Sequence, residues 1–172
     1  MKKLLMILVI SYIATLPFFG NVAISQSQEF KYAFANISAN IVIPIQAEEY
    51  SKLSFGKFSP GNGGSIIISP DGTVKTTSTV ILKDGTSTPG NFVVSGEIAA
   101  TVAVSIPNIS TLTNENQQSM IVDNWSIDRE KNIRLNDGSQ SISVGATLNV
   151  GSMDQNPKGI YTGTYQIVFS YN

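Results

Sequence analysis

The chain has 172 residues, with 11 basic and 12 acidic side chains, and it contains neither cysteine nor histidine. This length suits one domain plus a processed segment, and the nearly balanced charge does not favour binding to nucleic acid. The absence of cysteine and histidine removes disulfides, thiol and imidazole nucleophiles and the usual zinc ligands. We therefore expect a protein that is not an enzyme and that uses no cofactor and no metal.

The first residues have the pattern of an export signal. Two lysines precede the apolar run LLMILVISYIATLPFF, which is short for a membrane span and contains Pro17. Ala23 and Ser25 are small residues at the spacing that a signal peptidase accepts. We predict a signal peptide over residues 1–25 and an exported mature chain from about Gln26 that does not insert into the membrane, with a signal anchor as the alternative.

A short aromatic segment follows the predicted cleavage site. Phe30, Tyr32 and Phe34 alternate on even positions, whereas the apolar residues after them lie on odd positions. The alternation must therefore shift near Ala35. We predict an N-terminal extension over residues 26–34 and one folded domain over residues 35–172.

The segment ANISANIVIPIQA is the first candidate strand of that domain. It has one apolar and one polar face, and Pro44 lies within it. Because proline cannot donate to a central ladder, an edge strand or an exchangeable strand fits this segment, although an ordinary first strand is also open. The apolar face consists of Ile37, Ala39, Ile41, Ile43 and Ile45.

Period-two alternation continues through the rest of the chain, and no stretch has the spacing of an amphipathic helix. Turn sequences such as PDG, KDG, NDG and NPKG separate the runs. Many short strands with frequent turns indicate an all-β sandwich or barrel. The predicted strands are Lys52–Phe58, Ser65–Ser69, Val74–Leu82, Phe92–Ser95, residues 100–107, Met120–Ile127, residues 141–150 and the last residues of the chain, with a long polar loop over Ile109–Ser119.

The chain ends on its most regular strand, GIYTGTYQIVFSYN. The apolar and aromatic positions alternate almost to the last residue, from Tyr161 to Tyr171. A terminal strand of this kind is either paired within its own domain or offered to another chain. Both possibilities are open at this point.

The ordered motifs ANISANIVIPIQ, LSFGKFSPGNGGSIIISPDG, FVVSGE, VSIPN, SVGATLNV and YTGTYQIVFSY resemble the bacterial secreted domain of unknown function 4402 family. That family is similar to the major subunits of common-pilus type fimbriae. The resemblance covers about residues 35–172. It implies an immunoglobulin-like antiparallel β-sandwich, possibly completed by strand exchange, and a structural subunit of a surface fimbria or related polymer.

The C-terminus separately resembles the chaperone-usher pilins, which end in an alternating strand with a penultimate tyrosine and a glycine fourteen positions from the end. The resemblance implies an incomplete sandwich whose last strand borders a groove. A periplasmic chaperone fills that groove first, and the N-terminal strand of the next subunit then replaces it, so that the subunits self-associate at the cell surface. The matching residues are Gly159, Tyr161, Tyr165, Ile167, Phe169 and Tyr171.

A second class of function is open beside this one. A monomeric secreted adhesive or ligand-binding module could use loops such as Ile109–Ser119. The single tryptophan, Trp125, could stack on a sugar, although a core position fits it better. Glu48 and Glu49 are adjacent, so in a strand they point to opposite faces and do not form an acid and base pair.

Overall fold

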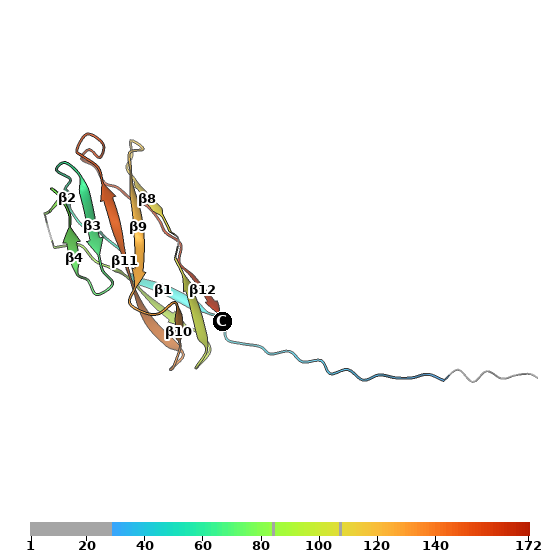
Figure 1. The fold of residues 1–172 in the computed structure, drawn as a ribbon. Helices are drawn as coiled ribbons and strands as arrows, with labels where there is room; N and C mark the ends of the chain where they lie inside the picture. The colour runs from blue at the N-terminus through green and yellow to red at the C-terminus, as the bar shows by residue number, and fades with distance from the viewer. Residues whose placement is uncertain (1–28, 84, 107) are drawn as a thin grey trace, which may run out of the picture. The chain divides into compact units, whose positions relative to one another are not determined.

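The computed structural model describes residues 29–83, 85–106 and 108–172, so the predicted signal peptide lies outside the described residues. The chain divides into two units, with the boundary between Ala39 and Asn40. In the first unit, the described residues 29–39 form no strand and are exposed. The second unit, Asn40–Asn172, holds all the strands shown in Figure 1.

All pairings described between these strands are antiparallel. Seven strands form one sheet, in which β1, β6, β11, β3 and β4 follow one another and β9 and β8 lie on the other side of β11. A second sheet has the order β10-β7-β12, and β2 pairs with β5. The strands are β1 (Gln46–Ser51), β2 (Phe58–Ser59), β3 (Gly64–Ile68), β4 (Val74–Thr76), β5 (Ile81–Leu82), β6 (Gly90–Ser95), β7 (Thr101–Ser105), β8 (Ser110–Thr113), β9 (Ser119–Ile127), β10 (Asn132–Arg134), β11 (Ser139–Val150) and β12 (Val168–Tyr171).

Strand β11 is the centre of the large sheet. Its first half pairs with β6, its second half pairs with β3, and β9 pairs along its opposite edge. The even-numbered side chains of β11 from Ile142 to Val150 are buried, because they alternate toward the covered face. One long strand therefore contributes to the whole length of the interior.

The second sheet covers the first half of β11. Val102 and Val104 of β7 pack against Ile142 and Val144 of β11, and these side chains are nearly inaccessible to solvent. We call this cluster the lower core. Its buried members are Phe92, Val94, Val102, Val104, Ile133, Leu135, Ile142 and Val144.

The second half of β11 is covered differently, by short strands and loops rather than by a continuous sheet. Phe55 and Val80 come from the segments around β2 and β5 and pack on Leu148 of β11. We call this cluster the upper core. Its buried members are Phe55, Ile66, Ile68, Val80, Met120, Val122, Ala146, Leu148 and Val150.

A β-bulge in β9 changes which side chains face the interior. Asp123 pairs with Thr147 and Ser126 pairs with Gly145, so two residues of β9 lie opposite one of β11. Asn124 has a positive φ of 47°, a conformation that asparagine tolerates better than most residues. The inward positions therefore shift from even to odd numbers, and Trp125 packs against both cores instead of facing solvent.

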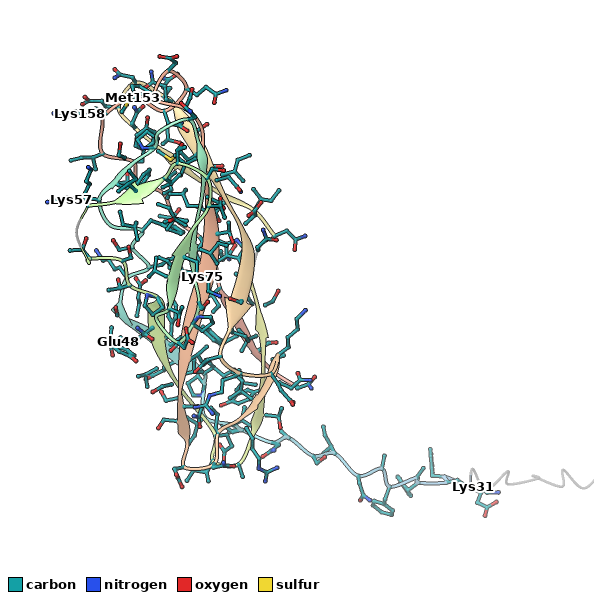
Figure 2. The ribbon with its side chains drawn as sticks, turned by 60° about the vertical axis from the view of Figure 1, so that its left-hand side comes forward. Lys31, Glu48, Lys57, Lys75, Met153 and Lys158 are labelled. Atoms are coloured by element: carbon teal, nitrogen blue, oxygen red, sulfur yellow. The ribbon has the colours of Figure 1, made fainter. Side chains whose placement is uncertain are left out.

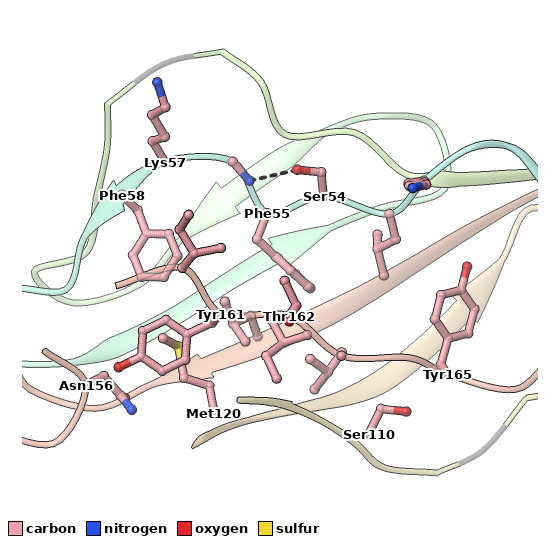
Figure 3. Close-up of a pocket in the computed structure, with 18 of the residues that line it drawn as sticks. Ser54, Phe55, Lys57, Phe58, Ser110, Met120, Asn156, Tyr161, Thr162 and Tyr165 are labelled. Atoms are coloured by element: carbon pink, nitrogen blue, oxygen red, sulfur yellow. Dashed lines mark hydrogen bonds between the residues drawn. The ribbon is translucent and has the colours of Figure 1, made fainter. Parts of the chain in front are cut away.

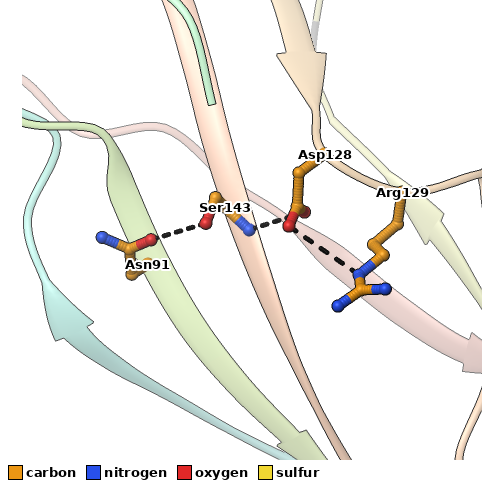
Figure 4. A network of polar contacts seen from close by, with 4 residues as sticks. All are labelled: Asn91, Asp128, Arg129 and Ser143. Carbon is orange, nitrogen blue, oxygen red and sulfur yellow. Dashed lines mark hydrogen bonds and ion pairs between the residues drawn. The ribbon is translucent and has the colours of Figure 1, made fainter. Parts of the chain in front are cut away.

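A polar network fastens the end of β9 to the large sheet (Figure 4). The main-chain N–H of Ser143 donates to Asp128 Oδ1 over 2.8 Å, and Ser143 Oγ donates to Asn91 Oδ1 over 2.7 Å. Arg129 Nε lies 3.7 Å from the other oxygen of Asp128. These contacts join β6, β11 and the turn after β9 on the partly exposed face of the sheet.

The expectation of an all-β, sandwich-like fold is confirmed. Strands β3, β6, β7, β9 and β11 lie where alternation predicted them. The PDG turn is also as expected: Asp71 Oδ1 accepts from the Thr73 N–H over 2.8 Å, and Gly72 has a φ of 83°. This hydrogen bond lowers the pKa of the Asp71 carboxyl.

Five predictions of local structure are wrong. Among the described residues 29–45 no strand forms, because the alternating residues from Ile37 have no paired neighbour. Lys52–Phe58 is mostly irregular, the predicted strand Val74–Leu82 is split into β4 and β5, and the predicted loop Ile109–Ser119 contains β8. The terminal strand is only Val168–Tyr171, because the residues before it pair at a single bridge, between Thr162 and Thr113.

We predict that Ile66→Ala destabilises the domain by about 2–5 kcal/mol, because it leaves a cavity in the upper core. Ile121→Ala is the matched control, since Ile121 is about half exposed on the neighbouring part of the same sheet. Chemical denaturation measures both variants. Equal losses from the two substitutions would contradict the assignment of Ile66 to the core.

Candidate functional site: an apolar groove beside the C-terminal strand

A groove of about 1020 Å³ lies above the second half of β11. Leu148, Met120 and Val122 lie at its floor. Figure 3 shows Phe55 and Phe58 on one side, with Tyr161 and Tyr165 on the other. The two sides are residues 52–60 and residues 157–167.

On each side of the groove, the main-chain hydrogen bonds are made to strands on the side that faces away from the groove. On one side, Ser54 pairs with Thr88, and β2 pairs with β5. On the other side, Thr162 pairs with Thr113 of β8, and β12 is the edge of its three-stranded sheet. An edge strand carries a row of unpaired N–H and C=O groups and accepts an added strand.

The structure brings most of the predicted C-terminal residues to this groove. Tyr161, Tyr165 and Ile167 are partly buried and line it, and Gly159 lies exposed along the same side. Phe169 and Tyr171 continue the alternation beyond the groove and pack on the lower core. The alternating aromatic and apolar residues of the terminal segment are therefore partly buried even where no regular strand forms.

Trp125 and Tyr165 form an aromatic pair in the lining of the groove. Their ring centroids lie 4.7 Å apart, and Phe92 approaches Tyr165 edge-on at 6.3 Å. Trp125 Nε1 and the Tyr165 hydroxyl oxygen are both shielded from solvent and have no hydrogen-bond partner within the described structure. Burial, with a smaller effect from the charge of Glu49, raises the pKa of Tyr165 to about 12.

The contact between Trp125 and Tyr165 was not predicted from the sequence, because alternation alone does not bring them together. Without the bulge at Asn124, strict alternation from Val122 would place Trp125 on the outer face of the sheet. The available signal was the asparagine that interrupts the apolar alternation of β9 immediately before the only tryptophan. Trp125 is partly buried, in agreement with the core interpretation.

The N-terminal arm, defined as residues 29–42, presents large apolar side chains to solvent. Ile37 is 98% exposed, Ile41 is 96% exposed and Phe34 is fully exposed. Ala39 is exposed as well. Contiguous apolar exposure of this kind indicates a segment that binds another surface.

The other two predicted donor residues belong to the domain in this structure. Ile45 is partly buried against the lower core, and Ile43 is held through its main chain. The Tyr171 hydroxyl donates to the Ile43 carbonyl over 2.6 Å and accepts from the Glu97 N–H over 2.7 Å, while Ile43 N donates to Glu97 Oε2 over 3.2 Å. This closed set of three hydrogen bonds, which we call the Tyr171 clamp, holds the residue that directly follows the arm.

The groove is mainly apolar, and its charged lining residues are Glu49, Lys52, Lys57 and Lys158. Figure 2 shows Lys158 beside Met153 at one end of the domain. Among the described residues, no group of three or more acidic, histidine or cysteine side chains could hold a metal ion. Within the same part of the chain, no helix has the length and apolar character needed to cross a bilayer.

These features define an antiparallel all-β domain with an unfilled apolar groove at its C-terminal edge. The family model described as "Domain of unknown function (DUF4402)" matches residues 45–171, and the chain belongs to this family. The match includes the groove, the aromatic pair and Tyr171, and it begins where the arm ends. Comparisons with the curated proteins and with the solved structures give no match.

We predict that Tyr171→Phe lowers the free energy of unfolding by about 1–2 kcal/mol, since the clamp loses two hydrogen bonds. Tyr50→Phe is the control, because Tyr50 is mostly exposed on β1. Amide hydrogen exchange should also become faster at Ile43 and Glu97 in the Tyr171 variant alone. Unchanged exchange at both amides would contradict the clamp.

We also predict that Tyr165 ionises at about pH 12, in an absorbance titration of the mature chain. The folded domain raises this pKa above its ordinary value of about 10, so it favours the neutral phenol. Stability from this group is complete below pH 10 and is lost as the pH rises toward 12. In Tyr165→Phe the late titration step should disappear; its persistence would assign it to another tyrosine.

Proposed function

We propose that this protein is an exported structural subunit of bacterial surface fimbriae or of a related polymer, and that it assembles by donor-strand addition. The observation that carries the proposal is the pairing of an unfilled apolar groove with an exposed apolar arm in one chain. The resemblance of the C-terminus to chaperone-usher pilins supports the same assignment. The arm of one subunit is the donor, and the groove of the next is the acceptor.

Each partner lacks what the other supplies. The groove has an apolar floor and two edges whose pairing is directed elsewhere, while the arm has apolar side chains and an unpaired main chain. An added strand satisfies the edges with main-chain hydrogen bonds and fills the floor with alternate side chains. Each buried isoleucine contributes about 1.5–3 kcal/mol before ordering costs.

The position of the clamp favours an open chain of subunits. Ile43 is held at Tyr171, at the C-terminal end of β12, whereas the groove lies along residues 157–167. An arm that enters a second copy from the end marked by Lys158 therefore runs antiparallel to residues 157–167. The arm of one copy then contacts the groove of the next, so the two copies use different surfaces. Such a head-to-tail contact propagates into a filament unless it closes into a ring.

The same clamp limits how the arm could fill its own groove. Because Ile43 lies at Tyr171, an arm that turned back over its own domain would place its earlier residues beside progressively earlier residues of the C-terminal segment. Such an arm would run parallel to residues 157–171. The arm orientation therefore differs between assembly and self-closure. Disulfide cross-linking can measure this difference. Because the chain has no native cysteine, a disulfide can form only between the two cysteines that are introduced.

An exported subunit with an open groove needs cover before assembly. Exposed apolar surface and edge strands are prone to uncontrolled association. We propose that a periplasmic chaperone occupies this groove during transit, after signal removal, and that the arm of another subunit replaces it at the cell surface. The partners are thus a chaperone and further copies of the chain, with no role for nucleic acid.

The alternative is a monomeric secreted module that binds a ligand or adheres through its loops. β8 now occupies much of the proposed binding loop, and the Asn114 side chain organises the remaining turn by accepting from the Asn116 and Gln118 amides. The loop is therefore a short, internally bonded turn. For a binding module, we would expect a stable monomer whose mass does not depend on the arm.

Light scattering of the mature chain tests the proposal. We predict oligomers whose mass rises with concentration and falls to that of the monomer when a peptide of residues 29–42 is added in excess. Ile37→Asp should abolish the oligomers, because a charge cannot enter the apolar groove without a partner. Ile109→Asp, at an exposed loop position, should assemble normally.

The outcomes separate the two functions. A wild-type monomer that ignores the peptide would overturn strand addition and favour the binding module. Oligomers that persist in Ile37→Asp would exclude this part of the arm as the donor. Cross-linking of cysteines placed in the arm and in residues 157–167 then reports whether the arm runs antiparallel in a second copy or parallel in its own.

A further inference from the structure

The groove contains one polar feature that strand addition alone does not explain. Trp125 Nε1 and the Tyr165 hydroxyl lie in its lining, shielded from solvent and without partners within the described residues. A buried donor without a partner costs about 1–3 kcal/mol, and unpaired buried groups are rare enough in native proteins to require an explanation. Two such groups on rings whose centroids lie 4.7 Å apart indicate a position where an occupant supplies the missing partner.

The chemistry of the pair specifies that partner. Indole nitrogen only donates, while a phenol hydroxyl both donates and accepts. A hydroxyl from the occupant can therefore accept from Trp125 and also pair with Tyr165. A purely aliphatic occupant would leave both groups unpaired.

The arm contains one residue that meets these requirements at a suitable place. The groove segment 157–165 has nine residues, and the arm segment 32–41 has ten. The two segments can pair along their whole length if the arm has a one-residue bulge near Ala35, where its alternation shifts. In an antiparallel arrangement that fills the groove, Ile41 lies level with Pro157, Ile37 with Tyr161 and Tyr32 with Tyr165.

This inference rests on the proposed strand addition. We propose that Trp125 and Tyr165 form a hydrogen-bonding subsite for the hydroxyl of Tyr32 of the incoming arm, and that this contact fixes the register of the donor strand. Trp125 Nε1 donates to the Tyr32 oxygen, and the Tyr32 and Tyr165 hydroxyls bond to each other. A shift of one residue would turn Tyr32 away from the subsite, so that only one register satisfies both groups.

The subsite opens as the strand enters. Both polar atoms are shielded in the unoccupied domain, so the Tyr165 ring must turn to reach the arriving hydroxyl. Tyr165 is only partly buried and belongs to an irregular segment at the side of the groove. Because its ring is stacked on the only tryptophan of the chain, fluorescence reports this step directly.

The test uses a full mature chain that cannot donate its own arm, the double variant Ile37→Asp and Ile41→Asp. A synthetic peptide of residues 29–42, which contains no tryptophan, is titrated into it and the fluorescence of Trp125 is recorded. The measurement is repeated with a Tyr32→Phe peptide, with Tyr165→Phe in the acceptor, and with both changes together. Tyr50→Phe in the acceptor is the matched control, since it removes an exposed hydroxyl outside the groove.

We expect each single change to weaken peptide binding about fivefold to tenfold, and the two together to cost little more than one. Tyr165→Phe should at the same time raise the melting temperature of the unoccupied acceptor, because it removes an unpaired buried hydroxyl. A structural role alone would lower stability instead. Tyr50→Phe should change neither quantity.

The possible results are distinguishable. If the wild-type peptide does not bind, the proposed strand addition fails and this inference fails with it. If it binds but the Tyr32→Phe peptide binds equally well, strand addition stands and the subsite is overturned. Additive losses, or a lower melting temperature for Tyr165→Phe, would also overturn the subsite, since the hydroxyl would then have a different partner.

Discussion

The structure depends on how the apolar face of β11 is covered. This strand of twelve residues contributes buried side chains along most of its length, from Ile142 in the lower core to Val150 in the upper core. The sheet of β7, β10 and β12 covers the first half completely. Over the second half, the covering layer consists of two short strands and connecting segments that do not meet, and the gap between them is the groove.

This division lets the domain fold although the second half of β11 is covered only in part. The lower core is closed by paired strands on both sides, so it holds Ile45, Phe169 and Tyr171 in place without any partner. The upper core has the side chains for a floor but lacks a strand above it. The Tyr171 clamp connects the two regions, because it fixes Ile43, which follows the arm, at the C-terminal end of the segment that borders the groove.

Alternation and turn residues were sufficient to predict β7 and β11, since both strands are paired and covered within the chain. They were insufficient for segments that have no pairing partner within the chain and for strands in which a bulge shifts the alternation. The residues from Ile37 to Ile41 alternate as a strand does but have no neighbour, and the bulge at Asn124 reverses the direction of Trp125. The contact between Tyr171 and Ile43 joins residues 128 positions apart, and no local pattern encodes it.

In the proposed polymer, the unpaired groups of Trp125 and Tyr165 have a physical rationale, because the assembled subunit would include the arm of another chain. An entirely apolar groove would stabilise the unoccupied domain, but it would accept an alternating strand in more than one register, because apolar side chains of similar size replace one another at modest cost. A buried hydroxyl pair penalises every register except one, and it also raises the free energy of the empty groove. Selection for one defined junction between subunits therefore favours a polar position that looks unfavourable when the domain is considered alone.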